Sequence, residues 1–334
     1  MPSRRIEQQL ESLSALLEKG ATEDAVGTLR KALNDRVNLV VAKAAYITAA
    51  LGTRVLMPNL LEAFDRLLKN GAETDPQCWG KNALAKALKD LGHDESPSFL
   101  RGLQHVQMEP VWGSRADTAG TLRSICVLAL LQCADLTRED KLWRQMSALT
   151  DSEATVRQGA ARALEEMDGR EAALLLRLKA RMGDREESVT GQALASLLSV
   201  EREGAVRFVA EFLEASEDRL QEEVREEAAL ALGTSRLPAA VQALIGYWQR
   251  SNGLHGEAIL RGISVSRQEE SLDFLIKIVR EGREREALWA LEALALHRDS
   301  ADIRARVAEA VRSRNEGSIA EQFSSQFNRP PATG

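Results

Sequence analysis

Residues 218–233 read DRLQEEVREEAALALG, and this stretch decides the fold that the sequence predicts. Asp218 stands where a helix N-cap is expected, because its carboxylate can accept a hydrogen bond from a backbone N–H of the first turn. Val224 and Ala228 begin a row of small and aliphatic residues at the spacing of one helix face. Gly233 follows the last of that row, where a helix C-cap is expected. The stretch therefore predicts a helix that packs closely through small side chains.

Weaker copies of the stretch recur along the chain. Counted from the position of Val224, the copies start at Val40, Gly80, Leu122, Val156, Val189 and Val224. The steps between these starts are 40, 42, 34, 33 and 35 residues. A regular period of this size is typical of a solenoid, in which each unit contacts only its neighbours.

Aspartate and arginine recur at fixed places in the copies. Asp117 precedes Arg123 by six residues, and Asp151 precedes Arg157 by the same interval. Such pairs resemble acid–base pairs, but a structural role explains the repetition better. We expect each Asp to cap its helix, a contribution of about 1 kcal/mol, and the Arg to join an ion-pair ladder between repeats.

The combination of Asp, Val-Arg, Ala-Ala and Ala-Leu-Gly resembles the HEAT-like repeats of bacterial proteins. The resemblance covers roughly residues 20–300 and is specific for the fold rather than for a function. It implies an all-α protein, a right-handed α-α superhelix of about eight helix pairs with capping helices. Tetratricopeptide repeats have a similar period, but their Trp, Gly, Tyr and Pro pattern is not found here.

The predicted solenoid forms one domain over residues 1–314. Capping helices are expected at 5–19 and at 300–313, and residues 315–334 form a polar tail. Within the tail, Ile319, Phe323 and Phe327 recur every four residues. This spacing fits either a short helix docked on the last repeat or a helix offered to a partner.

Composition and cysteine placement indicate the setting of the protein. A net charge of −6 argues against general affinity for nucleic acid, which needs a basic patch. We find no signal peptide and no apolar run long enough to cross a bilayer. Cys126 and Cys133 lie seven residues apart on one predicted helix, too far for a disulfide, and Cys78 adds no metal-binding spacing. These features favour a reduced, cytoplasmic setting.

No catalytic constellation emerges from the sequence. The histidines at 93, 105, 255 and 297 are scattered and form no His-x-x-His pattern, and no nucleotide-binding glycine motif is found. We therefore predict no catalytic, cofactor-binding or metal-binding residue, and we predict that the chain is not an enzyme.

Other HEAT-like proteins supply the alternatives. Some are di-iron hydroxylases with repeated His-Glu pairs, and here the nearest match, His93-Asp94-Glu95, occurs once. Others are bilin lyases, so a lyase-like enzyme or chromophore-binding protein is the first alternative. A third group binds DNA on a basic face. Nucleic-acid binding is the second alternative, although Glu222, Glu223, Glu226 and Glu227 would repel phosphate.

Helix geometry points to a candidate binding surface. Positions six and nine residues after each start point away from the packed face. We predict that residues from these positions flank a peptide- or protein-binding groove on the concave side: Tyr46, Lys86, Leu128, Arg162, Leu198 and Leu230. Mixed apolar and charged residues suit a protein partner better than a phosphate backbone. The competing interpretation is that flanking helices cover the leucines and the set is incidental.

The repeats are interrupted at residues 106–117, which read VQMEPVWGSRAD. Pro110 and Gly113 predict an irregular insertion, and loops on rigid scaffolds often carry function. Trp112 is a candidate partner anchor, or it fills a gap between repeats. The function that the sequence favours is a non-enzymatic scaffold or adaptor for a protein or peptide partner of unknown identity.

Overall fold

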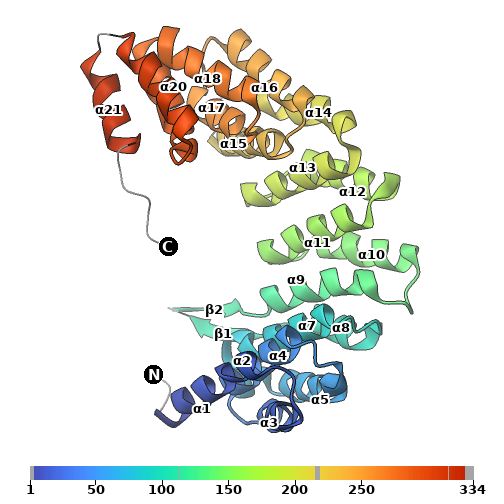
Figure 1. Cartoon of the computed structure of the whole chain (residues 1–334). Helices are drawn as coiled ribbons and strands as arrows, with labels where there is room; N and C mark the ends of the chain where they lie inside the picture. The colour runs from blue at the N-terminus through green and yellow to red at the C-terminus, as the bar shows by residue number, and fades with distance from the viewer. Residues whose placement is uncertain (1–3, 112, 215–218, 315, 328–334) are drawn as a thin grey trace. The chain divides into compact units, whose positions relative to one another are not determined.

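The computed structural model describes residues 4–111, 113–214, 219–314 and 316–327 (Figure 1). The chain divides into two compact units, Met1–Met167 and Asp168–Gly334, and each is described by itself. Helices pack on helices throughout both units, so the prediction of an all-α fold is confirmed. The prediction of one continuous solenoid domain over 1–314 stays a prediction.

The first unit has two layers of helices. The first helices of the pairs form one layer: α3 (Glu23–Leu33), α5 (Met57–Leu68), α8 (Ser96–Leu103) and α10 (Arg138–Ala148). The other, which we call the second-helix layer, consists of α1 (Arg4–Ser14), α4 (Asn38–Ala50), α7 (Trp79–Asp90), α9 (Gly120–Ala129) and α11 (Ala154–Met167). Within this layer each helix packs against the next in that order.

The second unit repeats the arrangement. Its first helices are α12 (Gly169–Met182), α14 (Glu203–Ala210), α16 (Pro238–Ser251), α18 (Glu269–Glu281) and α20 (Ala301–Arg312). Its second helices are α13 (Glu187–Glu201), α15 (Arg219–Thr234), α17 (Gly256–Val265), α19 (Glu284–Leu294) and α21 (Gly317–Phe327), and they pack in that order.

Short helical segments connect these elements. They are α2 (Leu16–Lys19) and α6 (Gly71–Thr74), and the 3-10 turns η1 (Arg54–Leu56), η2 (Pro76–Cys78), η3 (Leu130–Gln132), η4 (Glu211–Glu214) and η5 (Ala295–His297). The predicted capping helix at 5–19 is therefore divided between α1 and α2.

The repeated apolar positions form the core. The start residues Val40, Leu122, Val156 and Val189 are all fully buried, and so is the alanine four residues after Val156, Ala160. Burying a Val or Leu side chain contributes roughly 1.5–3 kcal/mol relative to leaving it exposed. The repeat register read from the sequence thus places the correct residues inside.

The predicted tail contains a packed helix. α21 lies against α19 and α20 and buries Ile319 and Phe327. Gln322 donates a hydrogen bond from Nε2 to the carbonyl oxygen of Leu288 at 2.9 Å. The structure therefore agrees with the first of the two interpretations, a helix docked on the last repeat. α21 takes the place that the second helix has in the preceding pairs.

The expected ion-pair ladder is seen at Arg123. Arg123 lies 2.6 Å from a carboxylate oxygen of Asp117, in its own repeat, and 2.8 Å from one of Asp151, in the next. Asp151 also accepts a hydrogen bond from the backbone N–H of Glu153 at 2.8 Å. The aspartate that leads the deciding stretch, Asp218, lies outside the described residues.

Two expectations about local structure are corrected. The insertion at 106–117 is not irregular, because β1 (Met108–Val111) and β2 (Ser114–Asp117) pair as an antiparallel hairpin (Figure 1). Gly233 is not a C-cap, since α15 continues through it to Thr234. Gly52 (φ 64°) and Gly92 (φ 74°) do follow second helices with a left-handed backbone.

Candidate protein-interaction face

The structure distributes the predicted groove residues over both units. On the first unit, Tyr46 of α4 is 56% exposed, and Lys86 of α7 is also exposed. Leu128 of α9 is half-buried and Arg162 of α11 is exposed. These four residues lie on consecutive helices of the second-helix layer, and each of these helices packs against the next.

The other predicted residues behave differently. Leu198 on α13 is only 1% exposed, so its prediction as a partner contact is wrong. The reason is that α13 packs against α12, α14 and α15, which leave little of its surface open. Leu230 on α15 belongs to the second unit and is 41% exposed. Trp112 lies outside the described residues.

Sequence reasoning missed Trp79, which begins α7 and is 58% exposed. Trp79 precedes Lys86 by seven residues, which is two helical turns and therefore the same face. The signal was available, because Trp79 directly precedes the start position Gly80 of its repeat. The predicted groove contains only positions after each start, so Trp79 lies outside it.

A strained turn places Trp79 at the surface. Two consecutive non-glycine residues before it, Gln77 (φ 60°) and Cys78 (φ 56°), have left-handed backbone conformations. Such conformations cost of order 1–3 kcal/mol each and persist only where the surroundings enforce them. Strain of this kind is concentrated at functional sites, so the turn indicates a candidate functional site near Trp79.

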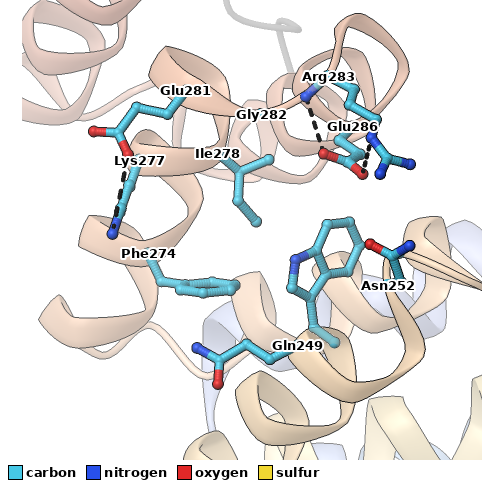
Figure 2. A pocket seen from close by; sticks show the side chains of 11 residues that line it. Gln249, Asn252, Phe274, Lys277, Ile278, Glu281, Gly282, Arg283 and Glu286 are labelled. Carbon is cyan, nitrogen blue, oxygen red and sulfur yellow. Dashed lines mark hydrogen bonds and ion pairs between the residues drawn. The ribbon is translucent and has the colours of Figure 1, made fainter.

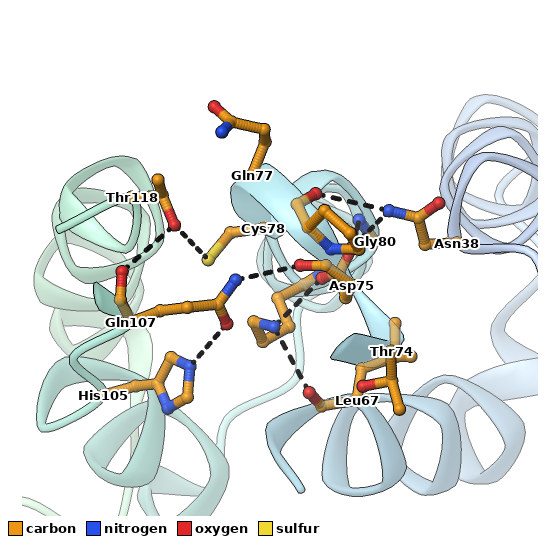
Figure 3. Close-up of polar contacts among 12 residues, drawn as sticks. Asn38, Leu67, Thr74, Asp75, Gln77, Cys78, Gly80, His105, Gln107 and Thr118 are labelled. Atoms are coloured by element: carbon orange, nitrogen blue, oxygen red, sulfur yellow. Dashed lines mark hydrogen bonds and ion pairs between the residues drawn. The ribbon is translucent and has the colours of Figure 1, made fainter. Parts of the chain in front are cut away.

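Asp75 is the first anchor of this turn (Figure 3). Its carboxylate accepts hydrogen bonds from the backbone N–H groups of Gly80 at 2.8 Å and Lys81 at 2.9 Å. Asn38 of α4 donates to the same carboxylate at 2.9 Å. One side chain thus fixes the start of α7 and ties it to α4.

Lys81 neutralises Asp75 inside the protein. Its Nζ lies 3.2 Å from the Asp75 carboxylate and donates to the carbonyl oxygen of Leu67, also at 3.2 Å. Both charged side chains are fully buried. A buried pair with further hydrogen bonds is stable as a unit, and removal of either partner leaves an uncompensated charge.

Glu109 of the hairpin is the second anchor of the turn. Its carboxylate accepts hydrogen bonds from the Gln77 backbone at 2.8 Å, the Gln77 side chain at 3.1 Å and the Thr118 hydroxyl at 2.8 Å. Burial acts to raise the pKa of Glu109, but hydrogen bonds from Gln107, Gln77 and Thr118 outweigh it and hold that pKa below its ordinary value. The hairpin is therefore attached to the turn through an ionised carboxylate.

We call the exposed surface of these two helices the α4–α7 face, defined by Lys43, Tyr46, Trp79, Lys86 and Lys89. Lys43 stacks on Tyr46, with Nζ 5.7 Å from the ring centroid. α4 contains no acidic residue, and α7 contains one, Asp90, which both Lys86 and Lys89 approach. The face combines two open aromatic rings with an excess of positive charge.

The second unit offers a cleft of about 460 Å³ between α16, α18 and the start of α19 (Figure 2). Trp248, Phe274 and Ile278 give it an apolar lining. At its rim Lys277 lies 4.0 Å from Glu281, and Arg283 lies 3.9 Å from Glu286. The cleft therefore combines an apolar lining with charged residues of both signs at its rim.

Reactive groups are not assembled in the described part of the chain. Within it, no three or more His, Cys, Asp or Glu side chains gather as a metal site. The three cysteines are buried, and burial raises the pKa of the Cys78 thiol to about 11. This thiol is therefore protonated at neutral pH and is a poor nucleophile.

Among the helices that the structure describes, none has the length and apolar character needed to cross a membrane.

The fold and this surface define a helical repeat protein, and the sequence comparison agrees. Residues 209–295 match the family model of HEAT repeats. This match supports HEAT-like repeats in that region, as the resemblance in the sequence implied. No curated protein sequence matches it.

One solved structure that matches is human deoxyhypusine hydroxylase in complex with glycerol. It is 20% identical, and the match covers 80% of this chain and 93% of that one, with a TM-score of 0.31. Deoxyhypusine hydroxylase is an enzyme, so the prediction that the present chain is not an enzyme does not stand. A likeness of this size carries neither an activity nor a substrate across.

Proposed function

We propose that this protein is a scaffold that binds a protein or peptide partner on the second-helix layer of its first unit. The observation that carries the proposal is the exposure of Tyr46 and Trp79, each more than half open, on two helices that pack side by side. Exposed Trp and Tyr residues are enriched among the side chains that dominate binding energy at protein interfaces.

The construction around Trp79 supports this assignment. Two consecutive left-handed residues precede Trp79, and a buried ion pair and a hairpin carboxylate hold the backbone on either side of it. Binding sites gain affinity when a contact residue is fixed before the partner arrives, because less entropy is then lost on binding. We therefore place the partner against the α4–α7 face. A cytoplasmic location fits this role and stays a prediction.

Site-specific photo-crosslinking in the native cell tests the proposal. p-Benzoylphenylalanine is introduced at position 46 or 79, and at Glu62 as a control. Glu62 is exposed on α5, in the first-helix layer of the same unit. We expect one protein to be crosslinked from positions 46 and 79 and not from 62. Equal crosslinking from all three positions, or none from 46 and 79, would contradict the proposal.

A further inference from the structure

Resting on the proposed function, we infer the chemistry of the partner: an acidic, extended peptide segment that lies across the α4–α7 face. Tyr46 and Trp79 contact its backbone and apolar groups, and Lys43, Lys86 and Lys89 face its carboxylates. The argument starts from charge, because the face is positive on a chain whose net charge is −6.

Charge complementarity distinguishes this face from other second helices. α4 and α7 together carry four lysines and one acidic residue, and one of these lysines, Lys81, is neutralised by the buried Asp75. The second helix α15 has the opposite character, with Glu222, Glu223, Glu226 and Glu227. An acidic segment is therefore attracted to the α4–α7 face and repelled by α15.

The start of α7 supplies no competing anion site. The N–H groups of Gly80 and Lys81, which would otherwise receive an anion, already donate to Asp75. Carboxylates of a partner must instead be met by lysine side chains. This requirement directs acidic residues of the partner toward the middle and the C-terminal end of α7, where Lys86 and Lys89 lie.

Helix spacing sets how an extended partner would be placed on this face. Packed helices lie roughly 8–10 Å apart, and an extended chain advances about 3.3 Å per residue. A segment crossing from α4 to α7 therefore passes from one helix to the other in about three residues. We expect acidic residues about three positions apart, with an apolar or aromatic residue near Trp79.

A nucleic acid is the other polymer that lysines and open aromatic rings attract. The affinity of a nucleic acid comes mainly from a large number of cations along its phosphate backbone. This face has three lysines, which is enough for a short acidic segment but few for a phosphate backbone. Single-stranded DNA is therefore included in the test as a probe.

The test begins with selection of displayed random 16-residue peptides by the full chain. Parallel selections use Lys43→Glu/Lys86→Glu, Trp79→Ala and the control Lys31→Glu/Lys69→Glu. The control makes the same charge change at exposed positions at the ends of α3 and α5. Far-ultraviolet circular dichroism checks that each variant keeps its helical content.

We expect wild type and control to enrich acidic peptides and the other two variants not to. Fluorescence anisotropy of the best peptide should then show binding weakened about tenfold or more by Lys43→Glu/Lys86→Glu or by Trp79→Ala, and by less than about twofold in the control. Affinity should also fall as the salt concentration rises from 50 to 200 mM, because dissolved ions screen the attraction between charges. At 0.1 M salt the screening length is ~10 Å.

Three outcomes would overturn the inference. Enrichment of apolar or basic peptides that survives both variants would reject the acidic partner and leave the proposed function standing. Tighter binding of a fluorescent oligo-dT strand than of the best acidic peptide would replace the peptide with nucleic acid. No enrichment of any peptide, together with no crosslinked protein from positions 46 and 79, would reject the proposed function as well.

Discussion

At the scale of single residues, glycine sets how closely two second helices approach. A Cβ atom added at Gly233 on α15 would lie 2.0 Å from the carbonyl oxygen of Gly262 on α17. One added at Gly262 would lie 2.5 Å from the carbonyl oxygen of Ala229. These neighbours are backbone atoms, so they cannot turn aside as a side chain would. The two helices can pack at this distance only while both positions lack a side chain.

We therefore expect Gly233→Ala to destabilise the protein by roughly 1–3 kcal/mol, because α15 and α17 must separate. The matched control is Gly246→Ala on α16, where the added atom meets the mobile end of Arg250 at 3.2 Å. The control should be stabilising by up to about 1 kcal/mol, the helix preference of Ala over Gly. Urea unfolding measures both, and equal stability of the two variants would contradict the close approach.

Lys81 gives a second prediction at this scale. Lys81→Met removes the cation and leaves the Asp75 carboxylate buried without its charge partner. We expect a loss of about 3–5 kcal/mol in the free energy of unfolding. The double variant Asp75→Asn/Lys81→Met should lose less than the sum of the single changes, since it removes both charges. Additive losses would mean that the two groups are not coupled.

At the scale of elements, the β1–β2 hairpin acts as a brace for the start of α7. Glu109 connects it to Gln77, and Asp117 at its far end accepts a hydrogen bond from the Gln107 backbone at 2.9 Å and pairs with Arg123. A two-stranded hairpin alone is marginally stable in water, so these side-chain contacts hold it in place. The hairpin thereby stabilises the turn that precedes Trp79.

The pKa of Glu109 predicts how the brace responds to pH. A carboxylate with a lowered pKa stabilises the folded state above its unfolded pKa of about 4.3, and this contribution is lost as pH falls through the folded value. Glu109→Gln should cost roughly 1.5–3 kcal/mol at pH 7. The stability gap between wild type and variant should shrink below about pH 4.3. Chemical unfolding from pH 7 to pH 3 measures the gap, and a constant gap would show that folding does not lower the pKa of Glu109.

The docked helix α21 gives the second prediction for an element. Ile319 is fully buried against α19 and α20, so Ile319→Ala should destabilise the second unit by about 2–5 kcal/mol. Glu321→Ala on the same helix is the control, because Glu321 is exposed and its loss should change stability by less than about 0.5 kcal/mol. Thermal unfolding distinguishes them. Equal melting temperatures would mean that α21 does not contribute to the core.

At the scale of the whole molecule, stability is organised by neighbouring helices within each unit. In repeat proteins a local change acts first on the repeats it touches. We expect Lys81→Met to lower hydrogen-exchange protection mainly within residues 1–167, and Gly233→Ala mainly within 168–334. Mass spectrometry of exchanged peptides reports both, with wild type as reference. Uniform loss of protection in either variant would show that the whole chain opens as a single unit.

Much of the fold was determined by the sequence alone. Helix formation and the repeat register depend on local spacing, so the buried faces of α4, α11 and α13 could be read from Val40, Val156 and Val189. The ion pairs of Arg123 with Asp117 and Asp151 could also be predicted, because Asp and Arg recur in the sequence with the same period. Each of these features depends on residues within one helix or on a pattern that recurs along the sequence.

Other features were decided only by tertiary structure, because they depend on which atoms lie opposite. Leu198 occupies a predicted surface position but is covered by neighbouring helices. Gly233 follows an apolar row but lies where α15 and α17 approach each other closely. The left-handed turn before Trp79, and its attachment to Asp75 and Glu109, are visible only in the structure. The local sequence determines which secondary structure a residue favours. Whether its side chain is exposed, and how closely two helices approach, depends on both of the surfaces that pack together.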